Sequence, residues 1–111
     1  MKRMMSLSEL KQVIAENQLV LLVMKSADCG VCESVQAKLS VMLESRTGIA
    51  GIYVYIADAP DVASEYLTLS APTVLVFHEG KEVYRIARFV LFDELDRLLS
   101  QYEQLMEEHD G

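Results

Sequence analysis

A short apolar run passes directly into a helical pattern in the first half of this chain, and the two cysteines lie at the junction. Residues 19–24 are all apolar, which is typical of a buried strand. Beyond them, apolar residues recur at every fourth position, as on one face of a helix: Val31, Val35, Leu39 and Leu43. Cys29 and Cys32 are therefore expected where a strand gives way to a helix N-terminus. Unpaired amide protons and the helix dipole favour negative charge there, so a thiol ionises more easily.

The remaining sequence alternates helix and strand patterns without a repeat or a linker, which predicts one domain over residues 1–111. Ser6 to Glu9 resembles a capping box that opens a first helix. Further helices are predicted at 30–46, at 60–66 and from about residue 92, and strands at 19–25, 52–57, 73–77 and 82–88. This order predicts an α/β fold with a mixed four-stranded sheet and helices on both faces. The first two strands should be parallel, and Glu79–Gly80 should turn the last two into a hairpin.

Composition excludes several classes of function. The 111 residues carry a net charge of −7, which argues against nucleic acid as a partner. The longest apolar run is too short to span a bilayer, so no membrane association is expected. Polar residues follow the basic start of the chain where a secretory signal would be apolar, which predicts a cytoplasmic protein. The acidic end, residues 103–111, is expected to be a solvated helix face and a frayed tail.

The cysteine spacing suits reversible redox chemistry. Residues three apart on a helix have Cβ atoms about 5–6 Å apart, and a disulfide spans Cα atoms about 4.4–6.8 Å apart. Cys29, at the cap position, is expected to be the more exposed and to attack a substrate disulfide, while Cys32 resolves the mixed disulfide. Two alternatives remain open: a pair of packed cysteines, and half of an intermolecular zinc site. Neither His78 nor His109 has acidic or cysteine neighbours at a ligand spacing, so no metal site is predicted in the chain itself.

A second motif gives the pair a context. Ala71-Pro72-Thr73 opens a predicted strand about forty residues after Cys29-Gly30-Val31-Cys32. With both motifs in this order, the chain resembles the thioredoxin superfamily over nearly its whole length. The resemblance implies a cis Pro72 that faces the cysteines and an extended substrate segment that pairs with the backbone of Ala71.

The activity that the resemblance implies is thiol–disulfide exchange. The substrate would be a disulfide-bonded protein or small thiol, with no bound cofactor, and an external reductase or thiol would recycle a monomeric enzyme. The alternative from another class is a thioredoxin-like binding module with little turnover, and a third reading is a zinc-bridged dimer through the cysteines.

The chain also departs from the family pattern. Val23 stands where the family has a buried acid, and Tyr53 stands where it has the acid's lysine partner. Water or a substrate group would then accept the proton of Cys32. Asp28 stands before the first cysteine in place of tryptophan, and its charge should hold the thiol pKa near the free value, as suits a reductant. Arg88 stands at a glycine position of the substrate groove, either to favour an acidic partner or as a solvated strand end. Leu67, Leu69 and Phe89 form either an apolar rim around the site or part of the core.

Overall fold

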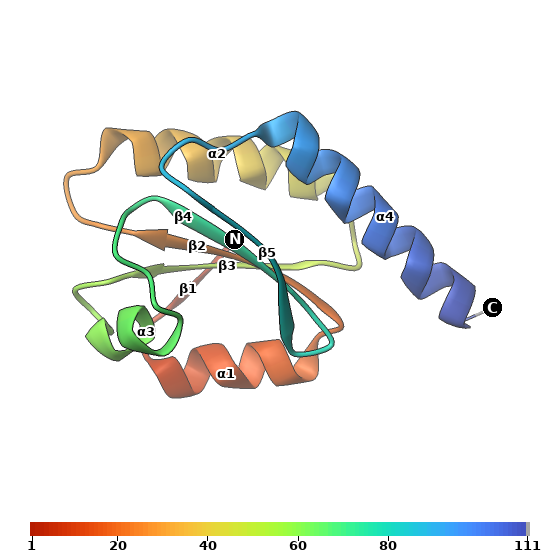
Figure 1. Cartoon of the computed structure of the whole chain (residues 1–111), viewed down its shortest axis with the longest axis horizontal. Helices are drawn as coiled ribbons and strands as arrows, with labels where there is room; N and C mark the ends of the chain where they lie inside the picture. The colour runs from red at the N-terminus through yellow and green to blue at the C-terminus, as the bar shows by residue number, and fades with distance from the viewer. Residues whose placement is uncertain (111) are drawn as a thin grey trace.

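The fold is built on a five-stranded sheet in the order β1-β3-β2-β4-β5 (Figure 1). The structure is a computed structural model, which describes the backbone of residues 1–110 and the side chains of residues 1–108. The elements follow the order β1 (Lys2–Met4), α1 (Leu7–Glu16), β2 (Leu19–Lys25), α2 (Gly30–Glu44), β3 (Ala50–Tyr55), α3 (Pro60–Glu65), β4 (Thr73–His78), β5 (Lys81–Ala87) and α4 (Phe92–Asp110).

The sheet is mixed, as the sequence predicts. β2 and β3 pair in parallel through the crossover helix α2, whereas β4 pairs antiparallel with β2 and β5 antiparallel with β4. The predicted α/β fold is confirmed, but the predicted count of four strands is wrong. The additional strand, β1, pairs in parallel with β3 at the edge of the sheet. It is three residues long and buries only Met4, so it has no alternating pattern that could be recognised in the sequence.

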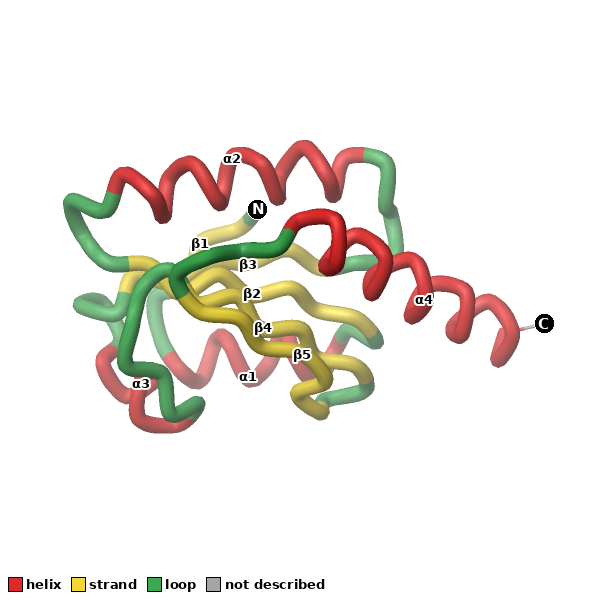
Figure 2. The backbone as a smooth tube through the Cα atoms, turned by 45° about the horizontal axis from the view of Figure 1, so that its top comes forward, coloured by secondary structure: helices red, strands yellow, loops and turns green. Residues whose placement is uncertain are grey.

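Helices cover both faces of the sheet (Figure 2). One cluster of buried side chains joins the sheet to α1 and α3, and a second joins it to α2 and α4. All seven residues of β2 are buried, because this strand is central and covered on both faces. The strand therefore anchors the segment that follows it, which leads into the cysteine motif.

Local chemistry explains the ends of the elements. The Ser6 hydroxyl accepts a hydrogen bond from the amide of Glu9 at 3.1 Å and caps α1. Glu79 and Gly80 both have positive φ angles, 50° and 82°, as a tight two-residue hairpin turn requires. None of the described helices is long and apolar enough to cross a membrane.

Two expectations about side chains are corrected. Val31, expected on the buried face of its helix, is 58% exposed because it lies in the first turn, beyond the edge of the core. Residues 92–110 form one helix, and Glu103, expected to be solvated, pairs with Arg46. The side chains of His109 and Asp110, and all of Gly111, lie outside the described residues.

Candidate active site

The two cysteines lie at the N-terminus of α2 and form a disulfide, with Cα atoms 5.2 Å apart. Cys29 is the N-cap residue, and its sulfur accepts a hydrogen bond from the amide of Cys32 at 3.1 Å. Cys32 is fully buried, whereas Cys29 is partly exposed. The amide that faces Cys29 would stabilise a thiolate on this sulfur when the pair is reduced. The chain thus presents one accessible sulfur and one shielded sulfur.

The Ala71–Pro72 segment lies at the same end of the molecule as the cysteines, and it is hydrogen-bonded there to the residue that follows β5. The Ala71–Pro72 peptide bond is cis, and the carbonyl of Pro72 accepts a hydrogen bond from the amide of Arg88 at 2.7 Å. Figures 1 and 2 show the loop before α2, the loop before β4 and the loop after β5 at one end of the sheet. Within the described residues, no hydrogen bond uses the backbone of Ala71. Its amide and carbonyl are therefore free to pair with an extended segment.

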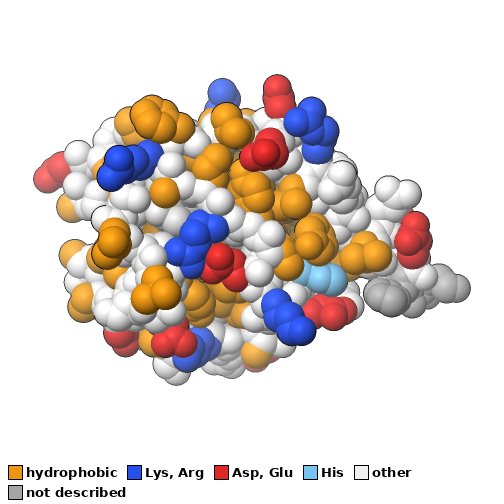
Figure 3. All heavy atoms as spheres, in the orientation of Figure 1, with side chains coloured by type: hydrophobic (Ala, Val, Ile, Leu, Met, Phe, Trp, Pro, Cys, Tyr) orange, Lys and Arg blue, Asp and Glu red, His pale blue; other side chains and the backbone are white. Residues whose placement is uncertain are grey.

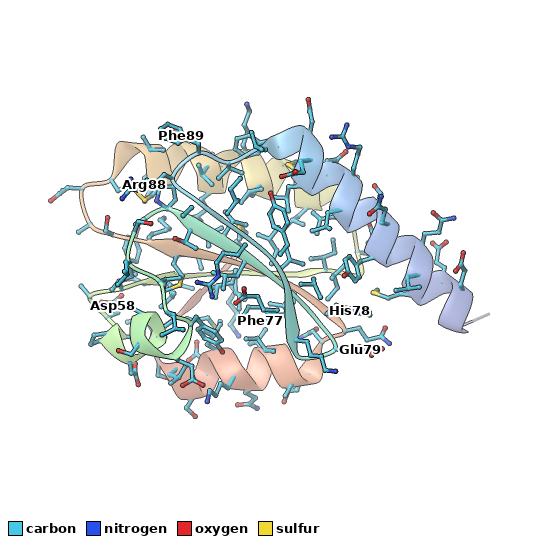
Figure 4. All side chains as sticks on the ribbon, viewed as in Figure 1. Asp58, Phe77, His78, Glu79, Arg88 and Phe89 are labelled. Carbon is cyan, nitrogen blue, oxygen red and sulfur yellow. A yellow bond between two sulfur atoms is a disulfide. The ribbon has the colours of Figure 1, made fainter. Side chains whose placement is uncertain are left out.

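Arg88 links this edge to the cysteine motif. Its φ angle is 70°, in the left-handed region where a glycine is unstrained, which fits the family's preference for glycine at this position. Its side chain is exposed and lines a groove of about 570 Å³ together with Gly30 and Val31, the two residues between the cysteines. Figure 4 shows Arg88 and Phe89 beside the start of α2. The structure thus brings Arg88 next to the cysteine pair.

A buried cation lies beneath the first turns of α2. Lys25, the last residue of β2, is 1% exposed, and its ammonium pairs with the carboxylate of Glu33 at 2.7 Å. It also donates to the side-chain oxygen of Gln36 and lies 4.7 Å from the ring centroids of Tyr53 and Tyr55. The Tyr55 hydroxyl donates to the same Glu33 oxygen at 3.1 Å. These contacts fix a charged pair between the end of β2 and the first turn of α2.

The charges of this pair reinforce each other. Burial lowers the pKa of Lys25, but its bonds to Glu33 and Tyr55 outweigh burial and leave the pKa above the ordinary value. The ammonium of Lys25 in turn holds the pKa of Glu33 below its usual range. Both groups are therefore ionised at neutral pH.

A second hollow lies on the other side of Cys29 and is acidic. Asp28, Glu33 and Tyr55 line it with Cys29, and it measures about 590 Å³. Asp28 is exposed, so its charge is well solvated. The accessible sulfur thus lies between an acidic hollow and the groove that Arg88 lines.

Val23 occupies a fully buried site in the core between the sheet and α2, and it pairs in register with Tyr53 of β3. No carboxylate is therefore buried at the position of the family's acid. The apolar residues expected at the rim are exposed: Leu67 by 80%, Leu69 by 102% and Phe89 by 82%. They are part of the surface around the site, and the alternative of core burial is wrong.

The described residues contain no group of three or more histidine, cysteine, aspartate or glutamate side chains placed to hold a metal ion. The ring of His78 packs against that of Tyr102, with centroids 4.9 Å apart.

Lys25 and Glu33 are the residues that the sequence analysis missed. Lys25 follows Val23 at the strand period of two, so it lies on the same face of β2, beneath α2. Glu33 follows Cys29 at the helix period of four and lies on the same side of α2. Both periods are visible in the sequence, but a lysine at the end of an apolar strand is usually a solvated terminus.

Comparisons with known proteins agree with this architecture. No protein-family model matches the sequence. A thioredoxin of Chlamydia caviae is 35% identical over an alignment of 81 residues, and the alignment covers 67% of this chain and 72% of that protein. The thioredoxin-like protein YdfQ of Bacillus subtilis is 28% identical over 102 residues, which is 92% of this chain and 91% of the relative. Among solved structures, a mutant thioredoxin from Halobacterium salinarum has a TM-score of 0.82 at 24% identity, covering 91% of this chain and 88% of its own.

Proposed function

Because this chain belongs to the thioredoxin superfamily, we propose that it reduces disulfides through Cys29 and Cys32, with Cys29 as the nucleophile. The observation that supports this assignment best is the asymmetry of the pair. Cys29 is partly exposed and its sulfur accepts a hydrogen bond from the amide of Cys32, whereas Cys32 is buried one helical turn further on. A nucleophile must reach its substrate, and a resolving thiol needs to reach only the nucleophile.

The reaction has two exchange steps. The Cys29 thiolate attacks one sulfur of the substrate disulfide, forms a mixed disulfide and releases the other substrate sulfur as a thiolate. Cys32 then loses its proton, and its thiolate attacks the Cys29 sulfur. This step releases the second substrate thiolate and closes the Cys29–Cys32 disulfide. Two electrons pass from the protein to the substrate, and an external reductase or a low-molecular-weight thiol returns them.

The surroundings of the pair support the other roles in this proposal. The free backbone of Ala71, next to Pro72, would pair with an extended segment of the substrate. Water would accept the proton of Cys32, because Val23 offers no carboxylate. Asp28 opposes the helix dipole at Cys29, so we expect a thiol pKa near the free value and a reductant in a reducing compartment. The protein would act as a monomer and without a cofactor.

A trapping experiment tests the proposal. The Cys32→Ser variant can form the mixed disulfide but cannot resolve it, so substrates should accumulate on Cys29 in a cell extract. The matched control is Cys29→Ser, which keeps one thiol but removes the nucleophile and should trap nothing. Adducts that form on Cys29 and disappear with dithiothreitol would identify the substrates.

Two outcomes would contradict the proposal. If Cys29→Ser traps as many partners as Cys32→Ser, the roles of the cysteines are reversed. If neither variant forms adducts, and the unmodified protein does not accelerate disulfide reduction over dithiothreitol alone, the chain is a binding module. Titration of the Cys29 alkylation rate adds an independent check, because a thiol pKa below about 5 would make the protein an oxidant.

A further inference from the structure

We propose that the groove between α2 and residues 88–92 selects segments of substrate proteins that carry a carboxylate beside an apolar side chain. This inference rests on the proposed reductase function and names the substrate class of the same site.

The groove begins at the cysteine motif itself. Gly30 and Val31 form one end, Ser34 and Lys38 of α2 continue it, and Phe89 and Phe92 form the opposite wall. Whatever occupies the groove therefore lies beside Cys29, the attacking sulfur. Val31 is 58% exposed and Phe89 82% exposed, so the walls offer apolar surface to an incoming side chain.

Two cations line this apolar groove without a partner. Arg88 and Lys38 are both exposed, and neither forms an ion pair with any residue that the structure describes. Five other cations of the chain are paired with carboxylates: Arg3, Lys11, Lys25, Arg46 and Arg85. In a chain with a net charge of −7, the lining of this groove holds two cations and no carboxylate, and the carboxylates of Asp93 and Glu94 lie in the adjoining hollow. A guanidinium presents a planar fork of donors that matches a carboxylate.

The charges around the groove also indicate where the carboxylate of a bound substrate would lie. The Lys38 ammonium lies 4.7 Å from the ring centroid of Phe92, which holds it over the groove. On the opposite side of Cys29, Asp28 lines the second hollow and would repel a carboxylate, whereas Glu33 in the same hollow is paired with Lys25. An acidic side chain of the substrate would therefore point toward Arg88 and Lys38.

The extent of the apolar surface favours a protein segment as the occupant. Leu67 and Leu69 precede Ala71, and Leu91 follows Phe89; all four leucine and phenylalanine side chains are more than half exposed. Figure 3 shows hydrophobic side chains interspersed with Lys and Arg side chains over this end of the molecule. A small disulfide could contact only a fraction of this surface, whereas an extended chain that pairs with Ala71 would cover much of it.

The test compares disulfide-bonded peptides that differ at one position beside the cysteine: glutamate, glutamine or lysine. With dithiothreitol as the recycling thiol, we expect kcat/KM for the glutamate peptide to exceed that for the glutamine peptide by about two- to fivefold, the range of an exposed ion pair. The lysine peptide should be the slowest. The preference should fall as salt rises from about 20 to about 500 mM, because salt screens exposed charges.

Substitutions in the groove test which residue produces the preference for the glutamate peptide. Arg88→Gln should reduce the glutamate-to-glutamine ratio to near one, and Lys38→Gln should reduce it in part. The control is Lys81→Gln, which removes one exposed charge at the far end of β5 and should leave the ratio unchanged. Circular dichroism of each variant establishes that it is folded.

The outcomes separate the two proposals. If no peptide is reduced faster than by dithiothreitol alone, the proposed function fails. If all peptides are reduced at equal rates, or if Arg88→Gln keeps the preference, the reductase function stands and the substrate class is wrong. If glutathione disulfide is reduced faster than the glutamate peptide, the occupant is a small molecule and the commitment to a protein segment is overturned.

Discussion

Breaking the ion pair between Lys25 and Glu33 should change the acidity of Cys29, and two single substitutions can test this in opposite directions. Lys25→Met removes the buried ammonium and leaves the carboxylate. Glu33→Gln removes the carboxylate and leaves the ammonium. At the sulfur the two charges nearly cancel in the intact protein, because their charged atoms are only 2.7 Å apart. Each substitution therefore exposes the sulfur to one uncompensated charge.

The expected shift in the pKa of the Cys29 thiol follows from helix geometry and Coulomb's law. Cys29 and Glu33 are four residues apart on α2, so their Cβ atoms are about 5–6 Å apart. With the ammonium bonded to Glu33, each charge lies about 8 Å from the sulfur. At an effective dielectric constant between about 20 and 80, one charge at this distance shifts a pKa by about 0.4 to 1.5 units. Lys25→Met should raise the pKa of the Cys29 thiol by this amount, and Glu33→Gln should lower it.

The assay is the rate of alkylation of Cys29 by iodoacetamide, measured between about pH 5 and 10 in a Cys32→Ser background. Methionine is close to lysine in volume, and the carboxylate left without a partner belongs to Glu33, whose side chain is 59% exposed and stays solvated, so Lys25→Met should fold. Lys81→Met is the control for an exposed charge and should leave the titration unchanged. Shifts of the same sign in both variants, or of less than about 0.2 units, would refute the electrostatic argument.

Three further predictions concern stability. The Arg46 side chain is 13% exposed and binds two carboxylates of α4. Arg46→Met should therefore lower the free energy of unfolding, measured in urea, by about 2 kcal/mol. An unchanged midpoint of the urea transition would contradict this. Ser6→Ala should lower the free energy of unfolding, measured by thermal melting, by about 1 kcal/mol, because it removes the N-cap of α1. Ser6→Asp should retain this cap and its stability. Burial and the hydrogen bond to Glu94 raise the pKa of Tyr84 to about 12. Unfolded tyrosine ionises first, so stability should fall as pH rises from about 10 to 12, and Tyr84→Phe should show a shallower fall.

Most of the fold could be predicted because its elements are long enough to show a period. The boundaries predicted for β2, α2, β3, α3, β4 and β5 differ from the observed ones by at most two residues. β1 has three residues and is held by its pairing with β3, a contact between distant parts of the chain. The same kind of contact draws Glu103 to Arg46 across 57 residues. Local patterns contain no information on such partners.

The same distinction between local patterns and distant contacts decides which parts of the site could be predicted. The cysteine motif and Ala71–Pro72 could be recognised because each is contiguous in the sequence. That Arg88 adjoins them depends on the pairing of β5 with β4, which places its amide on the carbonyl of Pro72. Burial of Lys25 could not be predicted, since it requires Glu33, Gln36 and two tyrosines of β3 to surround the ammonium.

The positions of Val23 and Lys25 indicate which of the two exchange steps should respond to charge beneath α2. Both side chains lie on the face of β2 beneath α2, and Lys25 is the one charged side chain that is buried among the described residues. In the family pattern, the charge beneath the helix is an acid that serves the resolving thiol. Here the position of the acid is apolar, and a cation lies two residues later, paired with a residue on the same side of α2 as Cys29. On the proposed mechanism, a change in this pair would therefore act on the attacking step and not on the resolving step. Substitutions of the Lys25–Glu33 pair should then change the rate at which the mixed disulfide forms more than the rate at which it is resolved.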